Sequence, residues 1–294
     1  MKDWCYEFAA KLMGACVSRL PNSVALAVGA GFGRLAFWLA ATERSRACEQ
    51  LQWCLNLSDN RRATAIAKRC FENLGKNVVE FLRFPGMDAG SLQQAVTFEG
   101  ASHIEEALAR GKGAIILTGH FGNWELLAAS ISAQVAPLTP IVRELRSPRL
   151  DALVSSYRTQ AGYATIDRDT GLRSALRCLK RNQLLGIVAD VDTKVNGVFV
   201  DFFGKPAYTP YSPVAIALKT GAAILPSFII RQPDGTHRAI IEPPLALERT
   251  AVNEEELVIN TQKFTNIIEG YIRRYPEQWV WMHERWKTRP EEER

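Results

Sequence analysis

The sequence has few of the residues that build disulfide-rich or zinc-binding folds. Its six cysteines form no CxxC pair, and its four histidines have no flanking Cys or His partners. A chain of 294 residues with 47% hydrophobic content can bury a core without disulfides, so we interpret the cysteines as reduced thiols in a cytosolic environment. The same scarcity argues against a structural zinc site, and no metal is expected.

Several catalytic signatures are also missing. There is no GxSxG elbow, no catalytic cysteine setting, no P-loop and no GxGxxG fingerprint before a helix. Covalent serine hydrolysis and nucleotide-driven chemistry therefore lose support, and no cofactor is expected. The net charge of +5 is mild and no block of consecutive Lys and Arg occurs, so nucleic acid is not an expected partner. Anionic lipid or an acidic carrier protein is compatible with this charge.

Long apolar runs are scarce, with one exception near the N-terminus. Residues 24–41 approach the length of a membrane span, but Arg34 near their middle costs roughly 2.5–3.5 kcal/mol in a bilayer. Gly29, Gly31 and Gly33 also weaken the run as a helix. We expect a helix that lies in one membrane leaflet rather than one that crosses. A buried helix of a soluble core is the alternative, and no cleaved signal peptide is expected.

The pattern of the chain changes near residue 90. Residues 1–90 look helical, whereas predicted strands and helices alternate from about residue 95. This alternation predicts an α/β fold with a mixed, largely parallel sheet and helices on both faces. We therefore divide the chain into an N-terminal helical, membrane-associating region, 1–90, and an α/β core with a C-terminal aromatic tail, 91–294.

A histidine and a carboxylate stand five positions apart after a predicted strand. The apolar run 113–119 reads as a buried strand, His120 follows it, and Glu125 falls in the first turn of the next predicted helix. In an open α/β sheet, ligands bind outside the carboxyl ends of strands. A carboxylate within reach of an imidazole would fix its tautomer and raise its basicity, which favours a general base. A capping or packing histidine is the alternative.

Other polar residues are candidates for the same region. Asp190 follows a second predicted strand, 184–189, so it could open onto the same crevice as His120, although a turn cap is an equal alternative. Two arginine series are either solvated faces or binding surfaces for phosphate. They are Arg143, Arg146 and Arg149, and Arg173, Arg177 and Arg181; Arg158 is a separate candidate.

Two aromatic clusters are open to two interpretations each. Phe199, Phe202 and Phe203 either line a slot for an acyl chain or belong to the core. In the tail, Trp279, Met282, His283 and Trp286 would share one face if 279–286 were a helix. That face suits a membrane interface, but packing against the domain is the somewhat stronger alternative.

These features together resemble the lipid A biosynthesis acyltransferases of Gram-negative bacteria, within the wider lysophospholipid acyltransferase superfamily. His120 and Glu125 match the HX4(D/E) motif of that superfamily. The resemblance runs over nearly the whole chain and includes the 197–204 stretch and the 275–279 segment. Val191 and Asp201 stand where many members have Gln and Pro, which bears on the acceptor more than on the reaction.

The resemblance implies acyl transfer from an acyl carrier protein thioester to a hydroxyl of a membrane lipid. A lipid A precursor is the first candidate, and a lysophospholipid, glycolipid or amino lipid is the alternative. A non-catalytic lipid-binding protein and a thioesterase are the competing classes. The substrates imply a location on the cytoplasmic face of the cell inner membrane.

The resemblance also suggests roles for individual residues. We expect His120 to deprotonate the acceptor and Glu125 to orient His120. Backbone amides near Gly122 and Asn123 would stabilise the oxyanion. Arg158 and Asp190 match positions where the family tends to have a functional arginine and an acid, and we expect them to bind substrate together with Arg143.

Overall fold

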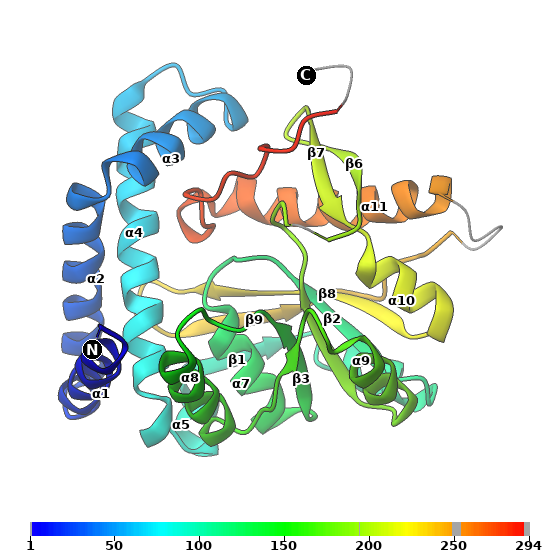
Figure 1. Ribbon diagram of the computed structural model, residues 1–294, viewed down its shortest axis with the longest axis horizontal. Coiled ribbons are helices and arrows are strands. Elements are labelled where there is room, and N and C mark those ends of the chain that lie inside the picture. Colours follow the sequence, from blue (N-terminus) through cyan, green and yellow to red (C-terminus); the bar gives the residue numbers. More distant parts are fainter. Residues whose placement is uncertain (1, 194, 249–253, 291–294) are drawn as a thin grey trace.

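The computed structural model describes residues 2–193, 195–248 and 254–290. Helices surround a central sheet, and the N-terminal helices form one flank (Figure 1). The helices are α1 (Lys2–Ser18), α2 (Asn22–Leu39), α3 (Ala41–Cys54), α4 (Asn60–Leu82), η1 (Phe84–Gly86), α5 (Ala89–Ala95), α6 (Ser102–Ala109), α7 (Trp124–Gln134), α8 (Pro148–Gln160), α9 (Leu172–Lys180), α10 (Ser212–Thr220), α11 (Glu254–Arg274) and η2 (Pro276–Gln278). The strands are β1 (Val96–Glu99), β2 (Ala114–Thr118), β3 (Leu138–Val142), β4 (Ile166–Asp167), β5 (Leu184–Val188), β6 (Gly197–Phe202), β7 (Lys205–Pro210), β8 (Ala223–Arg231) and β9 (His237–Ile241).

Seven strands form the central sheet, in the order β1-β9-β8-β2-β5-β3-β4. All neighbouring pairs are parallel except β8 and β9, which are antiparallel. The predicted mixed, largely parallel sheet is therefore confirmed. Strand β2 lies at the centre between β5 and β8, and Thr118 at its end is in register with Val188 of β5. The carboxyl ends of these two strands consequently open at the same edge.

Strand β2 has apolar residues on both faces because helices cover both. Ile115 and Leu117 pack into the hydrophobic cluster that includes residues of α9, α10 and α11. Ala114 and Ile116 pack into the cluster that includes residues of α5, α6 and α7. Side chains alternate between the two faces of a strand, so a strand buried on both sides reads as a continuous apolar run. This explains why residues 113–119 lack polar alternation.

Helix α2 packs on α4 at a close crossing built from small residues. A Cβ atom on Gly29 would lie 2.7 Å from the carbonyl oxygen of Gly75, and one on Gly33 would lie 2.2 Å from that of Phe71. Both distances are below contact range, so only glycine permits this crossing. The glycines that weaken α2 as an isolated helix therefore allow its association with α4.

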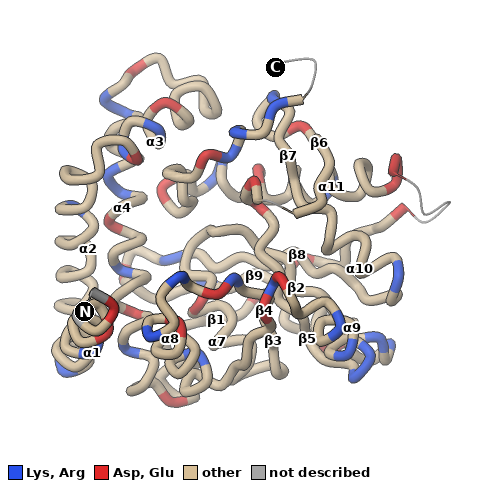
Figure 2. The backbone as a smooth tube through the Cα atoms, in the orientation of Figure 1, with Lys and Arg blue, Asp and Glu red and all other residues tan. Residues whose placement is uncertain are grey.

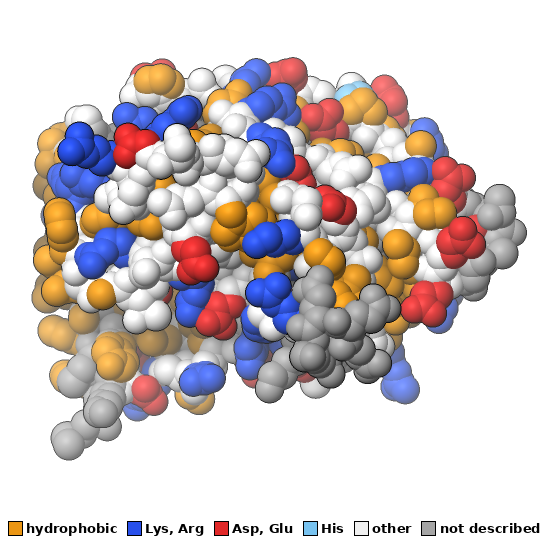
Figure 3. Space-filling model, turned by 90° about the horizontal axis from the view of Figure 1, so that it is seen from above, with side chains coloured by type: hydrophobic (Ala, Val, Ile, Leu, Met, Phe, Trp, Pro, Cys, Tyr) orange, Lys and Arg blue, Asp and Glu red, His pale blue; other side chains and the backbone are white. Residues whose placement is uncertain are grey.

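The opposite face of α2 is exposed and apolar. Trp38 is 65% exposed and Leu39 is 75% exposed, and Phe32 and Leu35 are also exposed. By length and composition α2 could cross a membrane, and one third of its residues are buried in the protein. Hydrophobic side chains lie along the flank that α2 forms, at the left of Figure 3.

The C-terminal tail is not a helix beyond the short turn η2, so the predicted shared helix face of residues 279–286 is wrong. Trp279, Trp281 and Trp286 are all buried, in one cluster with Phe202 and Phe203. Arg285, also buried, donates hydrogen bonds to the carbonyl of Tyr208 and the hydroxyl of Thr209. The tail thus packs against the β6–β7 hairpin, as the packing alternative predicted.

Candidate active site

His120 and Asp190 meet at the carboxyl edge of the sheet. His120 follows β2 in a tight turn, and Asp190 follows the neighbouring strand β5. The Nδ1 atom of His120 lies 2.8 Å from Oδ1 of Asp190. The backbone amide of His120 also donates to Oδ2 of Asp190, at 2.7 Å. The two strand ends therefore meet, but only His120 lines the cavity, because the side chain of Asp190 is buried behind it.

The carboxylate that orients His120 is Asp190, not Glu125. Asp190 is fully buried at its side chain and accepts a third hydrogen bond, from Nε1 of Trp279 at 2.7 Å. With Nδ1 donating to Asp190, the imidazole keeps its acceptor lone pair on Nε2. His120 lines a cavity, and its side chain is 25% exposed. The arrangement supplies an oriented base at a cavity wall.

The pKa values of the pair shift in opposite directions. Burial alone would lower the pKa of His120, but the charge of Asp190, its hydrogen bond and the charge of Glu125 raise it above its usual value. Burial would raise the pKa of Asp190, but His120 and the Trp279 hydrogen bond lower it to about 2. Asp190 is therefore ionised at neutral pH, and the imidazolium of His120 is stabilised.

Glu125 is held by two other side chains. Arg158 of α8 binds it in a bidentate pair, with Nε 3.0 Å from Oε2 and Nη2 2.6 Å from Oε1. The hydroxyl of Tyr163 donates to Oε2 at 2.5 Å. Glu125 still contributes charge near His120, but its direct contacts fix Arg158 at the cavity wall. Glu125 and Arg158, predicted separately, form one unit.

Backbone contacts in the turn after His120 occupy the amide of Gly122, which was expected to stabilise the oxyanion. Gly122 has a φ of +58°, and a Cβ there would lie 1.9 Å from the carbonyl oxygen of Ile229. Its amide donates to the carbonyl of Gln278 at 2.8 Å, and its carbonyl accepts from Asn77 at 2.6 Å. The Gly122 amide is therefore occupied, and its prediction as a substrate contact is wrong.

Asn123 is likewise structural. Its side chain is buried, its Oδ1 caps α7 by accepting from the amide of Leu126, and its Nδ2 donates to Glu80 at 2.7 Å. Neither Gly122 nor Asn123 lines the cavity beside His120. The first turn of α7 does reach that cavity, through Trp124 and Glu125.

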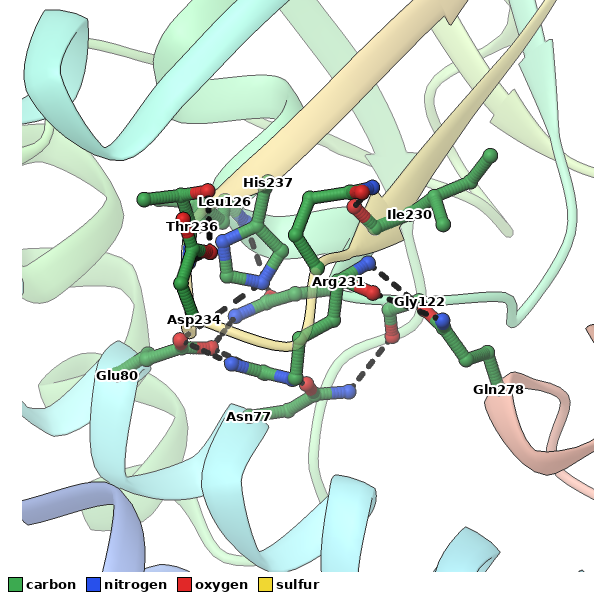
Figure 4. A network of polar contacts seen from close by, with 12 residues as sticks. Asn77, Glu80, Gly122, Leu126, Ile230, Arg231, Asp234, Thr236, His237 and Gln278 are labelled. Atoms are coloured by element: carbon green, nitrogen blue, oxygen red, sulfur yellow. Dashed lines mark hydrogen bonds and ion pairs between the residues drawn. The ribbon is translucent and has the colours of Figure 1, made fainter. Parts of the chain in front are cut away.

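A buried polar network connects this turn to α4 (Figure 4). Arg231 at the end of β8 donates to both oxygens of Glu80, at 2.5 and 2.6 Å, and to Asn77 at 2.7 Å. The amide of Arg231 also donates to the side chain of Gln278. Burial opposes ionisation of Glu80, but Arg231 lowers its pKa. Sequence spacing gave no signal for this network, because its members come from four distant segments.

The cavity at His120 has a volume of about 560 Å³, within the range of ligand pockets. Most of its wall is apolar, and the apolar lining residues include Ile116, Leu127, Leu138, Ile141, Ile187 and Ile216. Charged residues at the wall are Glu125, Arg143, Arg158, Asp167, Arg168 and Asp192. Arg143 thus lies where a substrate contact was expected.

The predicted acyl-slot residues lie elsewhere. Phe199, Phe202 and Phe203 belong to the β6–β7 hairpin and do not line this cavity. Phe202 and Phe203 are buried beside the tail tryptophans, and Phe199 contacts Tyr208. Phe202 and Phe203 therefore belong to the core, which was the alternative interpretation, and Phe199 is half-buried. The described residues also contain no group of three His, Cys, Asp or Glu side chains that could hold a metal ion.

Sequence reasoning missed three residues at the site. Tyr163 holds Glu125, Trp279 holds Asp190, and the ring of His283 lies 5.3 Å from that of His120. Burial and the nearby His120 lower the pKa of His283. Histidine is rare in this chain, so the position of His283 among the tail aromatics could have marked it as a candidate site residue. Nothing in the sequence around Tyr163 marks that residue.

A strand-end histidine, an ionised partner and a mostly apolar cavity are compatible with an enzyme that handles an apolar chain. Residues 2–288 match the family described as bacterial lipid A biosynthesis acyltransferase. The chain belongs to this family, and it is an acyltransferase. The resemblance inferred from the HX4(D/E) motif is thereby confirmed.

The descriptions of individual relatives name different acceptor lipids. The chain is 26% identical over 279 residues to a lipid A biosynthesis lauroyltransferase of Escherichia coli, covering 94% of this chain and 89% of the relative. It is 26% identical over 211 residues to a phosphatidylinositol mannoside acyltransferase of Mycolicibacterium smegmatis, covering 70% and 67%. A Mycobacterium tuberculosis protein of the same description is 30% identical over 162 residues, and this alignment spans about half of each chain, 53% and 51%.

Proposed function

We propose that this enzyme transfers a fatty acyl chain from an acyl carrier protein thioester to a hydroxyl of a membrane lipid. The observation that carries the proposal is the His120–Asp190 pair, with His120 at the wall of a mostly apolar cavity. A lipid A precursor is the favoured acceptor, because the alignment with the Escherichia coli lauroyltransferase spans most of both chains. The mycobacterial relatives keep a mannosylated inositol lipid as the alternative.

His120 acts as the general base. Its Nε2 takes the proton of the acceptor hydroxyl while that oxygen attacks the thioester carbonyl carbon. The tetrahedral intermediate then breaks its carbon–sulfur bond, and the leaving thiolate takes the proton back from the imidazolium. Asp190 stabilises the imidazolium and holds the ring by Nδ1 throughout.

The developing oxyanion lies near the start of α7. Trp124 and Glu125 of its first turn line the cavity, so the positive end of the helix dipole faces the reacting carbonyl. Arg158 binds an anionic group of the acceptor. The guanidinium of Arg158 has five N–H donors and Glu125 accepts from two of them, so the others are available to the acceptor. Arg143 offers a second cation at the same wall. The apolar wall holds the acyl chain.

The exposed face of α2 binds the enzyme to the membrane surface. Trp38 and Leu39 are among its most exposed side chains, and tryptophan favours the interface between lipid and water. The face toward α4 is buried, which suits a helix that lies in the interface better than one that crosses. With a carrier protein in the cytosol, the location that we propose is the cytoplasmic face of the inner membrane.

A product assay tests the proposal. The purified enzyme is incubated in mixed micelles with labelled acyl carrier protein, with and without a lipid A precursor, and the products are analysed by mass spectrometry. Acylated lipid is expected only with acceptor, and His120→Ala should abolish it while retaining the wild-type melting curve. Free fatty acid formed equally with and without acceptor would instead identify a thioesterase.

The acceptor and the location need separate tests. Lipidomics of a deletion strain reports acceptor and acyl chain together, and loss of one acyl group from lipid A is the expected result. Trp38→Ser with Leu39→Ser should shift the enzyme from the membrane to the soluble fraction at low salt. A wild-type enzyme that is wholly soluble under those conditions would contradict the membrane assignment.

A further inference from the structure

Helix α9 and its C-cap carry a row of cations that have no ion-pair partner among the described residues. Arg173, Arg177, Lys180 and Arg181 are exposed at spacings of three and four residues, so they lie along one side of the helix. Within the described part of the chain, no ion pair or side-chain hydrogen bond satisfies any of the four. Like charges at this spacing repel one another, whereas Arg177 and Lys180 in the last turn also interact favourably with the helix dipole.

The basic row is also unnecessary for packing. The buried side of α9 consists of Ala175, Cys178 and Leu179, and the partly buried Leu176 packs against the same core, so apolar residues fix the helix on the sheet. By contrast, Arg158 and Arg231 at the site and in the network each hold a carboxylate. Packing and ion pairing within the protein therefore do not explain why these unpaired cations are present on α9.

The patch continues beyond the end of α9. The side chain of Asn182 donates to the carbonyl of Leu108 at 2.9 Å, which ties the end of α9 to the end of α6. The turn that follows α6 exposes Arg110 and Lys112. Blue segments gather on and below α9 in Figure 2, across the molecule from α1 and α2. We call these six residues, on α9 and on the turn after α6, the α9 basic patch.

The patch begins at the entrance to the cavity. Gly171, Leu172 and Ala175 line the cavity at the start of α9, and Leu172 is 62% exposed. Arg168 lies at the same wall. A molecule bound along α9 thus has direct access to the space that ends at His120.

The apolar face proposed for the membrane lies on another side. Helix α8, on the other flank of the cavity, packs against α1, and Arg149 of α8 pairs with Glu7 of α1 at 3.2 Å. The acceptor lipid can therefore approach from the α1 and α8 flank while the α9 flank stays free (Figure 1). Leu172 is the one large exposed hydrophobic side chain on α9, so this helix lacks an apolar surface for lipid.

We propose that the α9 basic patch is the docking surface for an acidic protein that carries the acyl thioester. The proposal rests on the proposed function and specifies its donor: a protein recognised by charge, whose thioester enters the cavity past Leu172. Complementary charge chiefly accelerates encounter and fixes orientation, and this effect weakens with salt. A small thioester that lacks the carrier protein needs none of these contacts.

The test compares two donors in the doubly substituted enzyme Arg177→Glu, Arg181→Glu. With acyl carrier protein as the donor, kcat/KM should fall at least roughly tenfold, mainly through KM. With the same acyl chain on N-acetylcysteamine, kcat/KM should stay within about twofold of wild type. Raising the salt concentration should slow the wild type with the carrier donor and leave the variant nearly unchanged.

Two further variants control for damage to the helix and for net charge. Arg177→Gln, Arg181→Gln removes charge without adding repulsion and should show a smaller loss of the same kind. Arg61→Glu, Arg62→Glu makes the same charge change at exposed positions at the start of α4, away from the cavity, and should leave both donors unaffected.

The outcomes separate the docking proposal from the proposed function. Equal losses with both donors, or no loss with the carrier, would overturn the docking surface while leaving the reaction intact. Loss of binding to vesicles containing anionic lipid, with unchanged carrier kinetics in micelles, would make the patch a membrane contact and also overturn the proposal. A wild-type enzyme that acylates no lipid with either donor would refute the proposed function itself.

Discussion

His120 and His237 each lie beside a buried carboxylate, yet their environments give opposite chemistry. Asp190 binds His120 directly, at 2.8 Å, and the pKa of His120 is raised. Nε2 of His237 lies 3.7 Å from Oε1 of Glu80, and the pKa of His237 is lowered to about 4, mainly by burial. Proximity of an acid is therefore not enough to make a basic histidine.

The difference lies in the other partners of the carboxylate. Asp190 accepts from His120 and from the neutral Trp279, so its charge remains available to the imidazole. Glu80 is already neutralised by the bidentate Arg231, whose own charge also disfavours a protonated His237. His120 is poised to hold a proton, whereas His237 is kept neutral inside a structural network.

Removing each histidine should give the largest contrast. His120→Ala is expected to lower kcat by about a thousandfold, within the range for loss of a general base. His237→Gln should keep kcat within about threefold of wild type, because His237 lies outside the cavity at His120. The measurement is steady-state turnover with thermal melts of both variants. Equal losses would show that the two sites are not functionally distinct.

Breaking the Arg231–Glu80 pair should make His237 more like His120. Arg231→Met leaves Glu80 buried with an unneutralised charge, which costs about 3–5 kcal/mol of unfolding free energy. The pKa of His237 should rise, because the nearby cation is lost and the Glu80 charge acts on it. Chemical denaturation and an NMR titration of the His237 ring check the two effects; an unchanged ring titration would contradict the explanation.

Stability should depend on pH through His237. In the unfolded chain the His237 ring binds a proton below about pH 6.5, whereas in the folded protein the same ring stays neutral until about pH 4. The unfolded state therefore binds more protons in this window, and stability falls as the pH drops, by up to about 3 kcal/mol. His237→Gln should flatten the decline between pH 6.5 and 4 in urea denaturation. The raised pKa of His120 acts in the opposite direction, since its stabilisation is present below pH 6.5 and lost as pH rises through the folded value.

The smallest expected effect concerns the fixation of Glu125. Tyr163→Phe removes one hydrogen bond to Glu125 and leaves the Arg158 pair in place. A hydrogen bond to a charged group contributes about 1.5 kcal/mol, so kcat/KM should fall roughly tenfold or less. The pH profile should keep the limb set by His120 in place, whereas Asp190→Asn should move that limb to lower pH. A shifted limb in Tyr163→Phe would mean that Glu125 tunes His120 directly.

The parallel sheet was predictable from the sequence because its strands are local apolar runs between helices. The same reasoning placed His120 and Asp190 at strand ends. It assigned Glu125 to His120 by spacing, but their partners are decided by the order β2-β5 and by the packing of α8, which bring Asp190 and Arg158 from distant segments. Local periodicity does not predict which distant strands and helices become neighbours.

The prediction of a helix face in the tail, 279–286, is wrong for a related reason. Trp279, Met282 and Trp286 happen to recur at helical spacing, but Trp279 pairs with Asp190 and its backbone bridges to Phe121. Tertiary contacts override the local pattern there. The aromatic residues at 199–203 were similarly ambiguous, because a slot wall and a core surface have the same composition.

The contact between Trp279 and Asp190 has a consequence for how the enzyme comes into being. During synthesis His120, Glu125 and Asp190 all leave the ribosome before Trp279, and the carbonyl of Gln278 that fixes the Gly122 amide arrives equally late. The nascent chain can therefore complete its sheet while its base is still loosely held. His120 is thus held by its complete set of partners only after the segment that carries Gln278 and Trp279 has been made.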